Sequence, residues 1–310
     1  MIYTITLNPA IDLFIDTEKM QPNTVNRTQN YDIQANGKGI NVSFILKKIG
    51  LENQAIGVGG GFTADYIKNE LKRNHIPCYF AKSKGITRIN VFTRVVQNNE
   101  EYKLVNPGPI VEKKEQSKIL NYLTDNLKKD DVICISGSFS KGISPNILNE
   151  FSKIAKRNDA RVVLDTAYKE VLGVLKYHPW IIKPNEDEIK HWFGISQDLN
   201  KTQLAKLGKK LVEQGAQLVL ISLGSDGALL ISSKTILYGN APKIEVLNTA
   251  GAGDSMLGTF MGSLLKKNEL ASSLKSAIAA GSDAASREWI TDFSAAAKLE
   301  DEIKIDEIKV

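Results

Sequence analysis

The feature that most constrains the fold is an alternation of short apolar segments with amphipathic segments along most of the chain. The apolar segments are expected as strands at residues 2–7, 54–58, 132–136, 162–165, 180–183 and 218–222. The amphipathic segments are expected as helices at residues 40–49, 64–74, 115–128, 145–157, 201–214 and 253–267. Nearly continuous apolar strands that alternate with helices predict an α/β fold, in which helices cover both faces of a parallel sheet. Ligands of such sheets bind at the carboxyl ends of the strands.

Two stretches, at about residues 12–34 and 88–106, lack the helical period and alternate as exposed β-ribbons do. We expect them to pair into one small sheet, a lid over the carboxyl end of the main sheet; the alternative is two unrelated surface hairpins. Because a small sheet is marginally stable alone, the lid needs a partner surface. The chain contains no repeat and no linker, so residues 1–310 are predicted to form one domain with an inserted lid.

Composition gives no sign of a nucleic-acid-binding, membrane or metal-binding protein. The chain has 40 basic and 35 acidic residues, and this small, scattered excess does not indicate a nucleic-acid partner. No apolar run is long enough to span a membrane, and the first residues enter a strand pattern without a signal peptide, which predicts a cytoplasmic protein. The 2 cysteines form no CxxC pair, and the 3 histidines lack metal-ligand spacing.

The segment Ala250-Gly251-Ala252-Gly253-Asp254 precedes a long helical pattern near the C-terminus. Small residues let backbone N–H groups converge, and the helix start behind them adds a positive dipole end. This combination forms an anion hole suited to a phosphoryl group, and the Asp254 carboxylate is placed to take a proton from an attacking hydroxyl. The alternative is a glycine-rich turn in which Asp254 only caps the helix.

Two clusters early in the chain are candidates for binding a sugar phosphate. Asp12 follows the first predicted strand, where it either holds sugar hydroxyls or belongs to a turn. The turn Gly37-Lys38-Gly39, with Asn41 in the first turn of the helix that follows, combines close backbone approach with a cation.

Two clusters later in the chain are candidates for binding a nucleotide. Asn185 and Glu188 lie three residues apart on one face of a helix start, where they either hold water on Mg²⁺ or cap the helix. A glycine turn after the strand at residues 218–222 is suited to nucleotide phosphates or ribose and contains Ser222, Gly224, Ser225 and Gly227. The chain has no GxxxxGK[ST] loop, and residues 57–62 lack the dinucleotide fingerprint, which disfavours a dehydrogenase.

These clusters, in this order, resemble the ribokinase-type (PfkB) sugar kinases over essentially the whole chain. The two signatures of that family are similar to residues 37–41 and residues 250–255. Within the family, residues 4–12, 87–91, 136–138 and 180–185 are most similar to the 1-phosphofructokinases, with the tagatose-6-phosphate kinases as close relatives. The chain departs from the family pattern at two places. Asn36 replaces a usual glycine or alanine, and Phe139-Ser140 replaces a Leu-Pro pair.

The resemblance implies a role for each matching residue. Asp254 is implied as the base, with Gly251, Ala252 and Gly253 as the anion hole, and Asp12, Gly39 and Asn41 as ligands of sugar hydroxyls. Lys38, Arg88, Ser138 and Arg27 are implied to hold the phosphate that the substrate already carries. Lys183, Asn185, Glu188, Ser222, Gly224 and Gly227 are implied for ATP and Mg²⁺. Asn90, two residues beyond Arg88 on one strand face, is expected to choose among sugar epimers.

The expected function is ATP-dependent phosphorylation of fructose 1-phosphate to fructose 1,6-bisphosphate, with ATP and Mg²⁺ as cofactors. The same chemistry on tagatose 6-phosphate is the nearest alternative. A non-catalytic sugar-phosphate sensor is a different class, and a sensor would need no base at position 254. A homodimer that forms through the lid is expected, because lids of this family often pair in that way.

Overall fold

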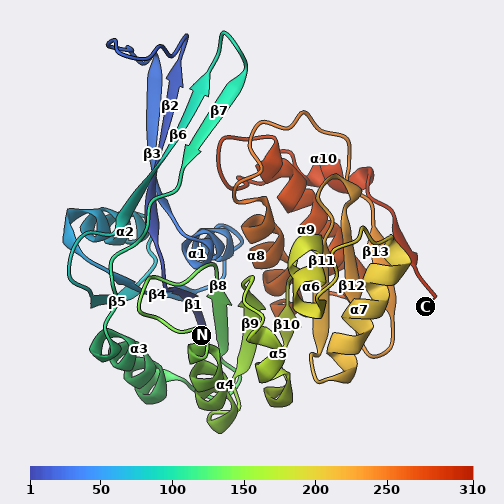
Figure 1. The fold of residues 1–310 in the computed structure, drawn as a ribbon. Helices are drawn as coiled ribbons and strands as arrows, with labels where there is room; N and C mark the ends of the chain where they lie inside the picture. Colours follow the sequence, from blue (N-terminus) through green and yellow to red (C-terminus); the bar gives the residue numbers. More distant parts are fainter. Residues whose placement is uncertain (310) are drawn as a thin grey trace.

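The computed structural model describes residues 1–309, and Figure 1 shows their fold. A ten-stranded sheet has the order β14-β13-β12-β11-β10-β9-β8-β1-β4-β5, and its strands run parallel from β5 to β11. The parallel strands are β1 (Ile2–Thr6), β4 (Asn53–Gly59), β5 (Cys78–Lys82), β8 (Val132–Ser136), β9 (Arg161–Asp165), β10 (Ile181–Ile182) and β11 (Leu218–Ser222). The antiparallel edge consists of β12 (Ala228–Ile231), β13 (Ile236–Gly239) and β14 (Ile305–Glu307).

Helices cover both faces of this sheet, as the alternating pattern predicts. One face packs against α1 (Lys38–Lys48), α8 (Ala252–Leu265), α9 (Leu270–Ala285) and α10 (Ala296–Asp301). The other packs against α3 (Lys113–Asn126), α4 (Ile147–Arg157), α5 (Val171–Val174), α6 (Glu186–Phe193) and α7 (Lys201–Glu213). Successive side chains of a strand point to opposite faces, so Ile133 and Val132 enter different cores. The expected α/β class is confirmed.

A second sheet of four strands, in the order β3-β2-β6-β7, stands away from the main body in Figure 1. Its strands are β2 (Ala10–Thr17), β3 (Asn30–Asn36), β6 (Arg88–Val95) and β7 (Glu100–Leu104). The two stretches that lack helical period supply all four strands, and β2 pairs with β6 in parallel. The base of this lid packs on α2 (Gly61–Arg73) and α1, where Ile11 and Ala35 share a buried cluster with Ile67.

The expected strands and helices are all observed, with small differences at their ends, and the structure adds elements that the pattern did not predict, among them β5, β12, β13, β14 and α9. The first helix begins at Lys38, two residues earlier than its apolar pattern, because the Gly37 turn with φ of +138° brings the chain into the helix. Strand β10 contains only Ile181 and Ile182, both fully buried. Within residues 1–309, each helix is too short or too polar to cross a membrane.

Candidate active site

The residues predicted to form an anion hole lie at the start of α8. Gly251 adopts φ of +80° and ψ of −10°, a left-handed conformation that favours glycine. The helix begins at Ala252, so the N–H groups of its first turn have no partner within the helix. A side chain at Gly253 would meet the Lys183 ammonium at 3.4 Å. The Ala252 N–H donates to the Thr249 carbonyl over 3.3 Å, outside the helix. The other N–H groups of this turn, the helix dipole and the lysine all favour an anion.

Asp254 lies in the first turn of the same helix and is buried. Its Oδ2 accepts a hydrogen bond of 2.7 Å from Asn41 Nδ2. Burial raises the pKa of the Asp254 carboxyl to about 6, while the positive charge of Lys38 opposes that rise. A carboxylate whose pKa lies close to neutrality is ionised at physiological pH and still basic enough to take a proton.

Asp165, which ends β9, joins two of the predicted site lysines. Its Oδ1 lies 3.1 Å from Lys183 Nζ and 3.3 Å from Lys38 Nζ, and its side chain is completely buried. Although burial opposes the effect, the two ammonium groups hold the pKa of the Asp165 carboxyl below its usual value. Sequence reasoning missed this residue, although an aspartate at the carboxyl end of an apolar strand was an available signal.

On the sugar side, a line of hydrogen bonds runs from Asp254 into the lid. Asn41 Nδ2 also donates to Asn36 Oδ1 over 2.8 Å, and Asn36 Nδ2 donates to Asp12 Oδ2 over 2.5 Å. The other oxygen of Asp12 accepts from Asn90 Nδ2 over 2.7 Å. The structure thus brings together Asp12, Asn41 and Asn90, and adds Asn36, which the sequence marked only as a departure from the family pattern.

Two of the predicted phosphate ligands, Arg88 and Ser138, lie at the base of the lid on either side of Asn8. Arg88 Nη2 donates to the Asn8 carbonyl over 3.0 Å, and Asn8 Nδ2 donates to Ser138 Oγ over 3.1 Å. The Nε of Arg88 is buried without a partner in the described chain. Arg88 is close enough to Asp12 to influence its pKa, so this guanidinium lies at the lid end of the hydrogen-bonded line.

Arg27 is separated from the other predicted phosphate ligands. Strand β2 carries Asp12 near its start and ends at Thr17, and β3 begins at Asn30, so Arg27 belongs to the loop between them. This β2–β3 loop lies at the far end of the lid in Figure 1. The Arg27 carbonyl accepts a hydrogen bond of 3.2 Å from Thr17 Oγ1, which ties this loop to the tip. The residues around Arg27 do not indicate which end of the lid their loop occupies, so the sequence could not separate Arg27 from Arg88.

The predicted nucleotide clusters are neighbours in space. Asn185 and Ser222 form an isolated parallel bridge, which places the start of α6 beside the glycine turn. In that turn, Gly224 and Gly227 have φ of +57° and +91°, and a side chain at Gly227 would collide with the Gly239 carbonyl. Ser225 is exposed between them.

Asn185 and Glu188 form a capping box at the start of α6. Asn185 Oδ1 accepts from the Glu188 N–H over 2.8 Å, and Glu188 Oε2 accepts from the Asn185 N–H over 2.9 Å. Capping therefore uses one oxygen of each side chain and leaves one carboxylate oxygen of Glu188. Across residues 1–309, three or more acidic, histidine or cysteine side chains do not gather as a metal cage.

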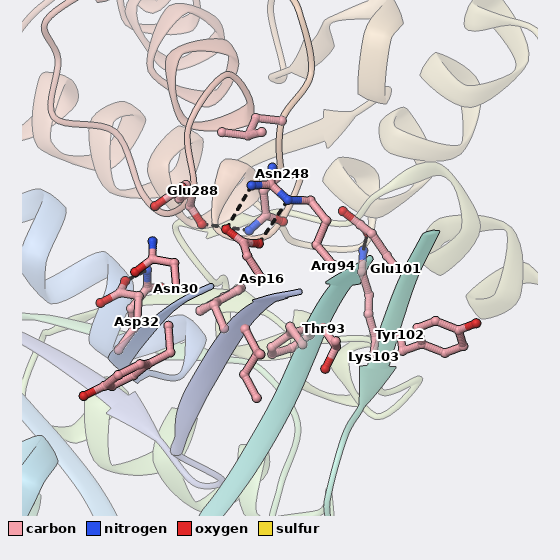
Figure 2. Close-up of a pocket in the computed structure, with 16 residues that line it drawn as sticks. Asp16, Asn30, Asp32, Thr93, Arg94, Glu101, Tyr102, Lys103, Asn248 and Glu288 are labelled. Atoms are coloured by element: carbon pink, nitrogen blue, oxygen red, sulfur yellow. Dashed lines mark hydrogen bonds and ion pairs between the residues drawn. The ribbon is translucent and has the colours of Figure 1, made fainter. Parts of the chain in front are cut away.

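A groove lies between the inner face of the lid and the loops beside α8. Figure 2 shows Asp16 and Arg94 of the lid facing Asn248 and Glu288. Arg94 donates to both oxygens of Asp16, each over 3.0 Å, and the Phe14 and Phe92 rings stack 5.0 Å apart beside this pair. Asn248, on the opposite wall, accepts from the Ala250 N–H over 3.0 Å and so orients the approach to the anion hole.

The sequence profile of the pfkB family carbohydrate kinases matches residues 4–292. The chain belongs to this family. As a pfkB-family kinase, it is a phosphotransferase that uses an alcohol group as acceptor, which confirms the expected family and enzyme class.

Two curated relatives of this pfkB kinase match over nearly its whole length. A D-tagatose-1-phosphate kinase of Bacillus licheniformis is 39% identical over 305 residues, which cover 98% of this chain and 99% of the relative. A 1-phosphofructokinase of Borreliella burgdorferi is 35% identical over 309 residues, with 99% of each chain covered.

The solved structures that this pfkB kinase matches include phosphofructokinase-2 of Escherichia coli in complex with fructose-6-phosphate. The two folds agree with a TM-score of 0.86 at 25% identity, over 97% of this chain and 98% of that one. Another structure of the same Escherichia coli enzyme, a tetrameric inhibited form, matches over the same shares with a TM-score of 0.88 and 25% identity.

Proposed function

We propose that this kinase transfers a phosphoryl group from ATP to the C6 hydroxyl of a ketohexose 1-phosphate, with fructose 1-phosphate as the first candidate. One observation carries the proposal. The hydrogen-bonded line has a buried base, Asp254, at one end, and Arg88 beside Asp12 at the other. Such a site fits an acceptor that carries its phosphate at the end opposite to the hydroxyl that reacts.

At the catalytic end, Asp254 takes the proton from the attacking hydroxyl, for which its Oδ1 remains after Oδ2 has accepted from Asn41. The N–H groups at Gly251, Ala252 and Gly253 stabilise the negative charge that develops on the transferred group. Lys38 and Lys183 are held by Asp165, so both ammonium groups are already in position when the charge develops. We therefore assign Lys38 to the reacting end of the substrate, together with Lys183.

At the other end, Arg88 and Ser138 bind the phosphate that the substrate already carries, and a guanidinium fork suits that group. Asn8 aligns the two side chains, since it contacts both. Between the two ends, Asp12, Asn41, Asn90 and the backbone at Gly37 and Gly39 contact the sugar. Arg27 can bind this phosphate only from the lid tip of a second copy, because the β2–β3 loop of its own lid lies at the end of the lid far from Asp12.

On the nucleotide side, the donor set fits ATP with a weakly protein-bound Mg²⁺. ATP supplies the phosphoryl group, and Mg²⁺ on its phosphates offsets their charge. Such an ion keeps several waters and needs few protein ligands, which agrees with a single free oxygen on Glu188 and the neighbouring Asn185. The turn that contains Ser222, Gly224, Ser225 and Gly227 then faces the nucleotide.

The relatives are named as kinases of ketohexose phosphates, which supports this class of substrate. Their names differ in which sugar phosphate they give. D-Tagatose 1-phosphate is the second candidate, because the Bacillus licheniformis kinase named for that substrate is 39% identical. Fructose and tagatose differ only in the orientation of the C4 hydroxyl. Tagatose 6-phosphate has weaker support, since the tagatose-6-phosphate kinase of Staphylococcus epidermidis is 29% identical over 283 residues.

A coupled assay with purified protein, ATP, Mg²⁺ and each of the three sugar phosphates tests this proposal. We expect turnover with the two 1-phosphates and the highest kcat/KM with fructose 1-phosphate. A higher kcat/KM for D-tagatose 1-phosphate would change the sugar and leave the reaction type. Absence of turnover with all three, from protein that is folded by circular dichroism, would refute the proposed substrate class.

We also propose that two copies associate through the outer face of the lid. Strand alternation places Asp12, Phe92 and Arg94 on the inner face, so the outer face carries the exposed apolar side chains Tyr31, Ile33, Tyr102 and Leu104. An exposed apolar face on a small sheet is a typical interaction surface. A second copy of the lid would cover it and would bring its Arg27 loop to the neighbouring subunit.

A further inference from the structure

Within the described chain, Asn36 is the only residue whose side chain hydrogen-bonds both to the lid carboxylate Asp12 and to Asn41, the amide that holds the base. Its side chain makes three hydrogen bonds. Nδ2 donates to Asp12 Oδ2 over 2.5 Å, and Oδ1 accepts from Asn41 Nδ2 over 2.8 Å and from the Gly37 N–H over 2.6 Å. The glycine or alanine that the family pattern places here makes none of these hydrogen bonds.

The contact with Asn41 fixes the orientation of the Asn41 amide. Asn41 Nδ2 has two hydrogens; one goes to Asp254 Oδ2 and the other to Asn36 Oδ1. Both donors are therefore used, and Asn41 Oδ1 is left as a buried acceptor without a partner in the described chain. Because a buried acceptor without a partner is unfavourable, that oxygen is available for a hydroxyl donor of the substrate.

The contact with Asp12 fixes the lid carboxylate in the same way. Asn36 and Asn90 each occupy one lone pair on a different oxygen of Asp12. The remaining lone pairs then point in set directions, so sugar hydroxyls must match them. A site built to hydrogen-bond a hydroxyl discriminates strongly against a sugar that places the hydroxyl elsewhere.

We propose that Asn36 is a positioning residue, which ties Asp12 of the lid to Asn41 and Asp254 and so sets how strongly the kinase discriminates between C4 epimers of its ketohexose phosphate. This inference rests on the proposed function. Asn36 orients the two groups that contact the sugar, and it needs no contact with the sugar itself. Asn36→Gly and Asn36→Ala remove all three side-chain hydrogen bonds, while only glycine adds backbone freedom before Gly37.

The test compares kcat/KM for fructose 1-phosphate and for D-tagatose 1-phosphate in wild type and in both variants. We expect the ratio of kcat/KM for fructose 1-phosphate to kcat/KM for D-tagatose 1-phosphate to change about fivefold, toward 1. This is about the effect expected from the loss of one hydrogen bond. The KM for ATP should stay within about twofold, because the hydrogen bonds that the substitutions remove all lie on the sugar side. The acidic limb of the pH profile should move to higher pH, since Asn41 is then free to turn its carbonyl toward Asp254.

Asn158→Gly provides a matched control, because its amide caps α4 through the Ile154 carbonyl, away from the site. A ratio and a pH profile that both stay unchanged in Asn36→Gly and Asn36→Ala would overturn the inference. Failure of the proposed function has a different signature, since wild-type protein would then turn over neither sugar phosphate. A change only in Asn36→Gly would assign the effect to backbone freedom and would also overturn the inference.

Discussion

Asn41 donates a hydrogen bond of 2.7 Å to Asp254, which joins the helix after the Gly-Lys-Gly turn to the helix after the anion hole. The two residues are 213 positions apart in the sequence. Their pairing brings a side chain proposed to bind the sugar against the proposed base. Asp254 is the ionisable member of this pair, so we expect the stability and the activity of the kinase to depend on its protonation and on the charged groups around it.

The buried charge of Asp254 should reduce stability at neutral pH. Its pKa is raised from 3.8 to about 6, so the folded state binds the proton more tightly than the unfolded state does. Stability from this group is complete below pH ~3.8 and is lost as the pH rises through about 6. Asp254→Asn should therefore raise the free energy of unfolding at pH 7.5, on the order of 3 kcal/mol.

Thermal and urea denaturation of wild type and Asp254→Asn from pH 4 to 7.5 measure this effect. The advantage of the variant should shrink as the pH falls toward 4, because the wild-type carboxyl becomes protonated. A constant difference across this range would show that its origin is packing and not charge.

Asp165 and Asp292 offer a matched pair of ion-paired aspartates. Asp165 is fully buried between Lys38 and Lys183, whereas Asp292 pairs with Arg287 over 2.9 Å with 51% of its side chain exposed. Asp165→Asn should lower the free energy of unfolding by about 3–5 kcal/mol, because the buried Lys183 ammonium and the partly exposed Lys38 ammonium lose their buried partner. Asp292→Asn should cost at most about 1 kcal/mol. Equal losses in urea denaturation would contradict this account of the cluster.

Arg88 should act on the sugar and not on the nucleotide. Arg88→Ala removes a charge-assisted contact to the resident phosphate, so KM for fructose 1-phosphate should rise about tenfold or more, while KM for ATP changes little. Arg161 serves as a control, because its guanidinium lies 4.4 Å from the Trp180 ring, outside the proposed site. Steady-state kinetics with each substrate varied in turn provide the measurement. A parallel rise in both KM values in Arg88→Ala would speak against the phosphate assignment.

The outer face of the lid should control association. Leu104 is 61% exposed on that face, and Phe62 is similarly exposed, at 67%, on α2. Leu104→Glu should shift the protein toward a monomer in sedimentation velocity at micromolar concentration, because a charge would be buried in the contact. Phe62→Glu should leave the assembly state unchanged. A wild-type protein that is strictly monomeric, with and without substrate, would refute the dimer.

The parts of the site that the sequence predicted are those encoded locally. The proposed anion hole and Asp254 come from consecutive residues, and the capping box comes from residues three apart. Both patterns can therefore be recognised from residues that are close together in the sequence. Parallel strands that alternate with helices also place their carboxyl ends together. This is why Asp12, Asn41 and Lys183 could be assigned to one edge before the fold was known.

The parts that the sequence did not predict depend on register and on long-range contacts. Asp165 meets Lys38 across 127 positions, and nothing near Asp165 indicates that a lysine will be there. Asn36 became meaningful only when β2 and β3 paired with Asp12 close to it. Arg27 was grouped with Arg88 by resemblance, whereas its position follows from which end of the lid the loop occupies.

The most direct test of the central claim is the turnover of Asp254→Asn with fructose 1-phosphate and ATP. The variant keeps the shape of the side chain and removes the base, so kcat should fall ~10²–10⁴-fold, while binding of the sugar phosphate, measured by calorimetry, is largely retained. If Asp254→Asn instead keeps a kcat close to that of wild type, Asp254 is not the base and the mechanism proposed for this site is wrong.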